Sequence, residues 1–222
     1  MIPPNGRPLR LDQGYNRRIM RAWPRRSLAL LVLWALSARG QSDGAAAREA
    51  FLSKLVAAAV ERTHHYVRYD SAYVRIPYPG GDVPEHTGTC TDEIIRIYRV
   101  VGIDLQKEVH EDIARNFSVY PQKRWRVAHP DSNIDHRRVP NLMVFFARRG
   151  EVLPLSSRGE DYSPGDLVTW DLQSGVPHIG IVVDQRAASN RYMIVHNIGE
   201  GPKMEDVLFT WRITGHYRYY GP

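Results

Sequence analysis

The sequence predicts an α+β domain, in which helices come first along the chain and strands follow. Before Gly150, apolar residues recur every three or four positions, as they do in amphipathic helices. After residue 166, the apolar stretches are short, rich in β-branched and aromatic residues, and separated by turn residues. This separation predicts N-terminal helices that pack on a C-terminal antiparallel sheet.

The expected elements follow from these patterns and from residues that begin or end helices. Asp43 and Asp104 are candidate N-caps, Pro140 suits a first helical turn, and Gly102 and Gly150 are expected to end helices. We expect helices over residues 43–63 and 90–101, after Asp104, and from Pro140 to Gly150. We expect a short strand near residues 73–76 and longer strands over 167–170, 178–183, 191–197 and 215–220.

Residues 1–40 have the layout of a secretory leader. Five arginines between Arg17 and Arg26 precede an apolar run over residues 28–36, and small residues follow it at Ser37, Ala38 and Gly40. The run is too short to cross a bilayer. We therefore expect residues 41–222 to form one exported domain in the periplasm or cell envelope, without a stable membrane span. Met20 is an alternative start that would shorten the basic segment.

The positive charge of the chain is concentrated in this leader. The chain has 30 Lys and Arg against 24 Asp and Glu, a net charge of +6. Residues 1–40 hold eight of the arginines and one acid, so the remainder has 22 basic and 23 acidic residues and a net charge of −1. No nucleic-acid partner is expected for a domain of this charge.

Cys90 is the only cysteine, and it begins the pattern of the second expected helix. A thiol there is close to the free N–H groups of the first turn and to the positive end of the helix dipole. Both favour the thiolate, which is the nucleophilic form. The alternative is a buried structural cysteine, because free cysteines are often buried.

Two histidines flank neighbouring strands. His178 opens one apolar strand and His196 closes the next, so a hairpin would bring both to the same edge of the sheet. His178 could then deprotonate Cys90 while His196 holds the ring of His178, as in a catalytic triad. Asn197 is a competing orienting residue, although strand alternation places it on the opposite face from His196. The alternative for His178 is a half-buried side chain bound to backbone groups.

This order of cysteine and histidines resembles the NlpC-type cell-wall peptidases, a bacterial branch of the papain-like fold. Residues 164–168 (PGDLV), 178–181 (HIGI) and 195–196 (VH) match that family's turn and strands. Tyr78 resembles its tyrosine before the nucleophile. The resemblance implies a papain-like fold, in which Tyr78 helps to polarise the scissile carbonyl.

The chain from residue 66 to residue 220 also resembles the YijF-like bacterial envelope family, a domain of unknown function. Four strings carry this resemblance: residues 78–84 (YPGGDVP), 90–92 (CTD), 134–142 (IDHRRVPNL) and 215–218 (GHYR). This resemblance implies no reaction.

One departure from the NlpC pattern concerns the nucleophile. NlpC-type enzymes usually have an aspartate before the cysteine, whereas Asp92 comes two residues after Cys90. We therefore expect a different substrate pocket. Asp92 is a candidate substrate-binding residue, with Asp135, His136 and Arg137, because a guanidinium fork suits a substrate carboxylate. The alternative for the 135–137 segment is a structural ion-pair corner.

No metal or other cofactor is expected, because the chain has neither an HExxH motif nor paired CxxC motifs, and no glycine-rich phosphate loop follows a strand. The sequence thus predicts a monomeric exported cysteine peptidase or amidase that acts on the peptide stem of peptidoglycan. The alternatives are a non-catalytic envelope binding protein on the same scaffold and a lipid or ester acyl hydrolase.

Overall fold

The computed structural model describes the backbone of residues 26–173 and 175–222, and side chains from Gly44 onward except at residue 174. The chain divides into two compact units, residues 1–43 and residues 44–222. Most of the expected basic leader segment lies outside the described residues. No helix in the described part of the chain is long and apolar enough to cross a membrane.

Helix α1 (Arg26–Arg62) begins well before Asp43, so the predicted N-cap at that residue is wrong. The segments on both sides of Asp43 are rich in alanine and leucine, which are strong helix formers, so a single aspartate does not end the helix. In the second unit, Leu55, Val56 and Ala59 of α1 are buried in the core. The Arg62 guanidinium also binds Glu93 at 2.7 Å.

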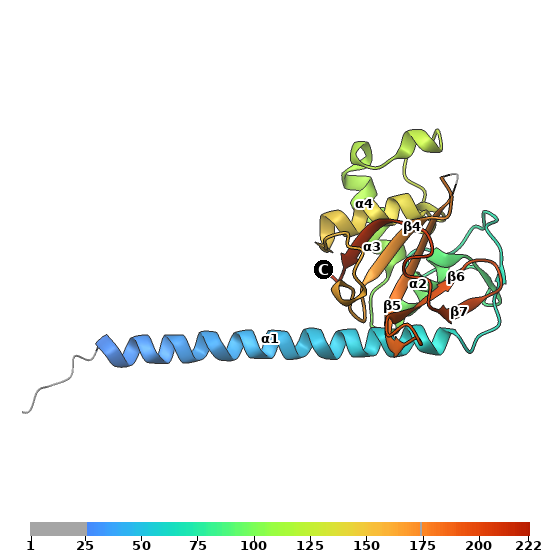
Figure 1. Ribbon diagram of the computed structural model, residues 1–222. Helices are drawn as coiled ribbons and strands as arrows, with labels where there is room; N and C mark the ends of the chain where they lie inside the picture. Colours follow the sequence, from blue (N-terminus) through green and yellow to red (C-terminus); the bar gives the residue numbers. More distant parts are fainter. Residues whose placement is uncertain (1–25, 174) are drawn as a thin grey trace, which may run out of the picture. The chain divides into compact units, whose positions relative to one another are not determined.

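The α+β prediction is confirmed, because the helices pack against a six-stranded antiparallel sheet (Figure 1). The strand order is β3-β8-β4-β5-β6-β7. In chain order, the strands of this sheet are β3 (Glu151–Val152), β4 (Leu167–Asp171), β5 (Pro177–Arg186), β6 (Tyr192–Asn197), β7 (Pro202–Glu205) and β8 (Arg212–Arg218). A separate parallel pair consists of β1 (Arg68–Tyr69) and β2 (Thr87–Gly88). Residues 73–76 are not a strand, so that prediction is wrong.

Three helices supply most of the remaining core: α2 (Cys90–Val100), α3 (Leu105–Arg115) and α4 (Val139–Arg149). Asp104 caps α3 as predicted, because its carboxylate accepts the N–H of Gln106. Short 3₁₀ turns lie at Phe117–Val119, Gln122–Arg124, Asp135–Arg137 and Gly159–Asp161.

The two faces of the sheet bury different clusters. Ile179 and Ile181 of β5 face the helices, whereas Val182 faces a second cluster that includes Trp170 and Leu208. This alternation is the side-chain period of a strand. Alternate residues of β5 and β6 therefore point either toward α2 or toward the second cluster.

A buried carboxylate joins β4 to β8. Asp166, within the segment that resembles the NlpC turn, accepts hydrogen bonds from Ser163 N–H (2.8 Å), His216 Nε2 (2.8 Å) and Arg218 Nε (2.7 Å). His216 Nδ1 binds the carbonyl oxygen of Pro154 at 3.0 Å. The aspartate is fully buried and has partners in the turn before β4 and on β8, so its role is structural.

Candidate active site

Cys90 is the first residue of α2, as predicted, because Thr89 and Asp92 cap the helix there. The Asp92 carboxylate accepts the N–H of Thr89 at 2.7 Å and its hydroxyl at 2.9 Å. A carboxylate in the first turn satisfies free backbone donors and is favoured by the helix dipole. The same turn buries Cys90, whose exposed fraction is 5 %.

The sulfur of Cys90 lies beside the beginning of β5. The backbone N–H groups of Ile179 and Thr91 are close enough to the sulfur to favour its ionised form. Ile179 directly follows His178, so the structure brings the thiol next to the strand position of the predicted base. By strand alternation the His178 ring lies on the face of the second cluster, with Trp170, whereas Cys90 packs with Ile179 in the helix-facing core. A direct contact between Cys90 and His178 therefore stays a prediction.

A chain of hydrogen bonds runs from His178 through His196 to Glu205. His178 Nε2 lies 2.8 Å from His196 Nδ1, and His196 Nε2 lies 2.9 Å from the Glu205 carboxylate. Strands β5 and β6 are antiparallel neighbours, which brings the two imidazoles to one edge of the sheet. Asn197 points to the other face, where its side-chain oxygen accepts the N–H of Gly199 at 3.1 Å. His196, rather than Asn197, therefore holds His178.

Aromatic rings enclose the two imidazoles. The ring centroid of Trp211 lies 6.1 Å from that of each histidine, and Trp170 lies 5.9 Å from His178. Burial, with a smaller effect from the neighbouring His196, lowers the pKa of His178 to about 3. Burial also lowers the pKa of His196, although Glu205 opposes this effect. Both imidazoles are therefore neutral at pH 7, as a general base must be.

The expectation that Cys90 is a thiolate is wrong for this structure. Burial raises the pKa of Cys90 to about 12, because removing the sulfur from water penalises the charged form. The negative charge of Asp92 raises it further, and the backbone N–H groups of Ile179 and Thr91 offset only part of the increase. The thiol and the neighbouring imidazole are therefore both neutral at pH 7.

The structure gives Tyr78 neighbours on α3 rather than at Cys90. Its ring packs edge-on against His110 with centroids 5.1 Å apart, and the nearby charges that act on its hydroxyl include Glu111 and Lys107. A different tyrosine, Tyr69, lies near the thiol. Tyr69 pairs with Gly88, two residues before Cys90.

Burial raises the pKa of the Tyr69 hydroxyl to about 12, and the charges of Cys90 and Asp92 add to the increase. The hydroxyl is therefore a hydrogen-bond donor at neutral pH. No sequence pattern pointed to Tyr69, because β1 and β2 have two residues each and no alternating pattern.

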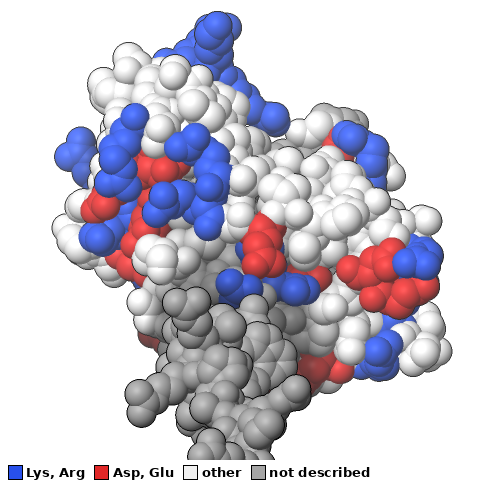
Figure 2. All heavy atoms as spheres, turned by 90° about the vertical axis from the view of Figure 1, so that its left-hand side faces the viewer, with Lys and Arg blue, Asp and Glu red and all other residues white. Residues whose placement is uncertain are grey.

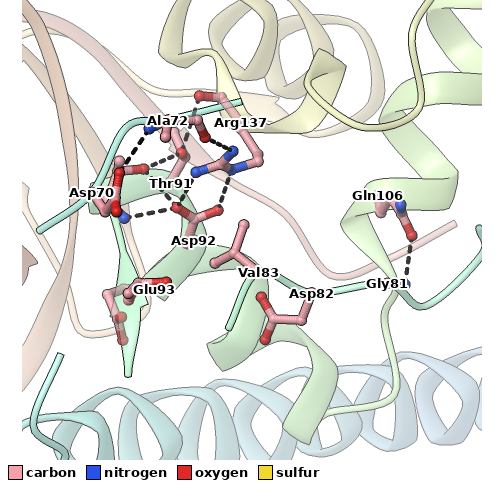
Figure 3. Close-up of polar contacts among 12 residues, drawn as sticks. Asp70, Ala72, Gly81, Asp82, Val83, Thr91, Asp92, Glu93, Gln106 and Arg137 are labelled. Atoms are coloured by element: carbon pink, nitrogen blue, oxygen red, sulfur yellow. Dashed lines mark hydrogen bonds and ion pairs between the residues drawn. The ribbon is translucent and has the colours of Figure 1, made fainter. Parts of the chain in front are cut away.

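Asp92 and Arg137 form a buried ion pair, shown in Figure 3. Arg137 Nε and Nη2 donate to the two carboxylate oxygens at 2.8 and 3.1 Å, and Nη1 donates to the carbonyl oxygen of Ala72 at 3.0 Å. Thr91 also donates its hydroxyl to the carbonyl oxygen of Arg137 at 3.1 Å. These contacts occupy the guanidinium fork, so the structure favours the ion-pair corner over a substrate-binding role for both residues.

The other two predicted substrate-binding residues are also buried. Asp135 accepts the N–H of Asp131 at 2.8 Å and binds His110 Nδ1 at 2.9 Å. His136 is 2 % exposed, its Nδ1 has no hydrogen-bond partner, and burial lowers its pKa to about 3. Asp135 therefore anchors the segment before α4 through its polar contacts, as the ion-pair alternative expected, whereas buried His136 has no such contact at Nδ1 among the described residues.

Three features decide what a ligand would meet near the histidines: a pocket, the charge of the surface and the presence or absence of metal-binding groups. A pocket of about 300 Å³ adjoins the start of β5, and its lining includes Pro177, Trp170, Met143 and Arg212. Figure 2 shows basic and acidic side chains intermingled over the face that it presents. Across the described side chains, no group of three or more His, Cys, Asp or Glu residues is arranged to hold a metal ion.

The fold and site define a mixed helix-and-sheet domain with a buried cysteine at a helix N-terminus and two paired histidines on the neighbouring strands β5 and β6. Residues 56–219 match the family model of the domain of unknown function DUF1287, so the chain belongs to this family. It is also 54 % identical over 152 residues to the uncharacterized protein YijF of Escherichia coli (strain K12). That match covers 68 % of this chain and 74 % of YijF.

Proposed function

We propose that this protein is a cysteine hydrolase that cleaves an amide bond in the cell envelope. The observation that carries the proposal is the hydrogen-bonded pair His178–His196 on β5 and β6, the strands that contact α2, whose first residue is Cys90. A nucleophile, a base and a group that orients the base are the three parts that such chemistry needs. The NlpC-type resemblance suggests a papain-like version of this arrangement.

The neutral state of both groups determines how the reaction would begin. Cys90 transfers its thiol proton to His178 as the sulfur attacks the carbonyl carbon, because a free thiolate is disfavoured in this buried position. Collapse of the tetrahedral intermediate expels the amine, which takes the proton from His178 and leaves a thioester. Water then adds to the thioester carbonyl with His178 again as the base, and the released thiol regains its proton.

The developing oxyanion needs hydrogen-bond donors, and two are near the sulfur. The backbone N–H of Cys90 is free at the helix N-terminus. The hydroxyl of Tyr69 is the second, because Cys90 is close enough to raise the pKa of that hydroxyl. We propose Tyr69 for the role that the sequence suggested for Tyr78. Tyr69→Phe should therefore slow hydrolysis, and Tyr78→Phe is the matched control.

The substrate class rests on the expected export and on the family resemblance. A secreted hydrolase that resembles cell-wall peptidases would act on the peptide stem of peptidoglycan. The test is digestion of purified sacculi with the wild type, Cys90→Ala and His178→Gln, followed by mass analysis of the released fragments. His86→Gln is the control, because His86 is exposed. Release by the wild type and the control alone supports the proposal, and equal release by Cys90→Ala contradicts it.

A second candidate function is favoured by the burial of Cys90. A neutral, 5 % exposed thiol is also what a non-catalytic binding protein would retain as a small core residue. In that case Cys90→Ser would sediment with insoluble peptidoglycan as fully as the wild type, and neither protein would release fragments. Fragment release that depends on Cys90 would exclude this alternative.

A further inference from the structure

The hydrogen-bonded histidines end at a third group, Glu205, which the sequence did not single out. Glu205 is the last residue of the edge strand β7, and its carboxylate accepts from His196 Nε2 at 2.9 Å. Its side chain is 41 % exposed, whereas that of His196 is 1 % exposed. Glu205 thus joins the buried histidine pair to solvent.

The chain of contacts fixes where each proton lies. An ionised carboxylate can only accept, so the hydrogen on His196 is on Nε2. The Nδ1 atom of a neutral imidazole protonated at Nε2 can only accept, so it takes its hydrogen bond from His178 Nε2. Neutral His178 then carries its single proton on Nε2 and leaves Nδ1 as an unprotonated base.

We propose that Glu205 is the positioning residue that sets both histidine tautomers, so that Nδ1 of His178 is the nitrogen that receives a proton from Cys90. This inference deepens the proposed function and rests on it for the role of Nδ1. The assignment of the tautomers themselves depends on the two hydrogen bonds and on the neutral state of both rings, and not on the reaction.

The charge of Glu205 also suits a transient cation. When His178 accepts a proton, the two imidazoles share a positive charge, and the carboxylate at the end of the chain favours that state. Lys203 on the same strand acts in the opposite direction on His196, although it is also paired with Glu200. Removing the carboxylate should therefore weaken the base even where the protein remains folded.

The experiment is NMR of protein labelled with ¹⁵N-histidine at pH 7.5, in which long-range ¹H–¹⁵N correlations distinguish protonated from unprotonated ring nitrogens. His178→Gln and His196→Gln spectra assign the two rings. The wild type should show Nε2 protonated and Nδ1 unprotonated in both. Glu205→Ala should give mixed tautomers in both rings and slow fragment release from sacculi by about tenfold or more.

Two further variants control for size and for charge. Glu205→Gln keeps the volume but can turn its amide to donate to His196, so it should also give mixed tautomers. Glu200→Gln removes an acid from the same loop without touching His196, and it should leave both tautomers unchanged. Thermal unfolding of each variant verifies that the comparison is made on folded protein.

The results separate this inference from the proposed function. A wild-type His178 protonated at Nδ1, or tautomers that persist in both Glu205 variants, would overturn the role of Glu205. The predicted tautomers in a wild type that releases no fragments would instead refute the hydrolase and leave the tautomer assignment standing.

Discussion

The titration of Cys90 gives the sharpest test of how the site works. The perturbation is a change of pH during alkylation of the wild type with iodoacetamide. Burial raises the pKa of Cys90 to about 12, whereas that of an ordinary thiol is about 8.5. At pH 7.4 the thiolate fraction is then lower by roughly three thousandfold, which corresponds to about 5 kcal/mol.

The assay is the rate of mass increase on alkylation between pH 5 and pH 10, with free cysteine as the reference. Because the thiolate is the reactive form, the rate for Cys90 should be far below that of free cysteine at pH 7.4. It should rise about tenfold per pH unit without reaching a plateau. Urea-unfolded protein should react like free cysteine, which shows that the fold is the cause.

A rate plateau between pH 5 and pH 7 would refute this reasoning. Such a plateau means that the sulfur and His178 exist as a thiolate–imidazolium pair, so their mutual attraction exceeds the penalty of burial. The proposed hydrolase would survive that result with a different first step, in which attack needs no proton transfer.

Three further predictions concern stability. Asp92→Ala should lower the free energy of unfolding by about 3–5 kcal/mol, because it leaves the buried Arg137 charge without its partner. Chemical denaturation measures this free energy. The control Asp161→Ala, at an exposed ion pair, should have a much smaller effect. Leu55→Ala should cost about 2–5 kcal/mol in the same assay, because it removes a fully buried side chain that α1 contributes to the core, and no loss would mean that α1 does not pack there. His136 has a pKa lowered to about 3, so between its ordinary pKa and about 3 the unfolded chain binds a proton that the folded chain does not. The free energy of unfolding therefore falls as the pH falls through this range. Between pH 7.5 and pH 5 the loss should be about 2 kcal/mol smaller in the His136→Leu variant than in the wild type, and equal losses would contradict a neutral buried His136.

Local patterns predicted the elements that place Cys90 and His178. The cap at Thr89 and Asp92 determines the start of α2, and the apolar alternation after His178 determines β5, so both were visible in the sequence. The hairpin that joins His178 to His196 followed from their order along the chain.

The parts that sequence analysis missed depend on contacts between distant segments. Glu205 lies on a four-residue edge strand that begins with a proline and has no alternating pattern, so β7 was not predicted. Tyr69 lies near Cys90 only because β1 pairs with β2. The raised pKa of Cys90 was missed because the position of a thiol on a helix can be inferred from sequence, whereas the depth of its burial cannot.

Helix α1 has a consequence for maturation of the protein. If export removes residues 1–40, the cut falls within this helix rather than in a linker between leader and domain. Residues 44–50 of the new N-terminal end are exposed, and burial begins with Phe51. A cut after residue 40 would therefore leave in place every hydrophobic contact described for α1.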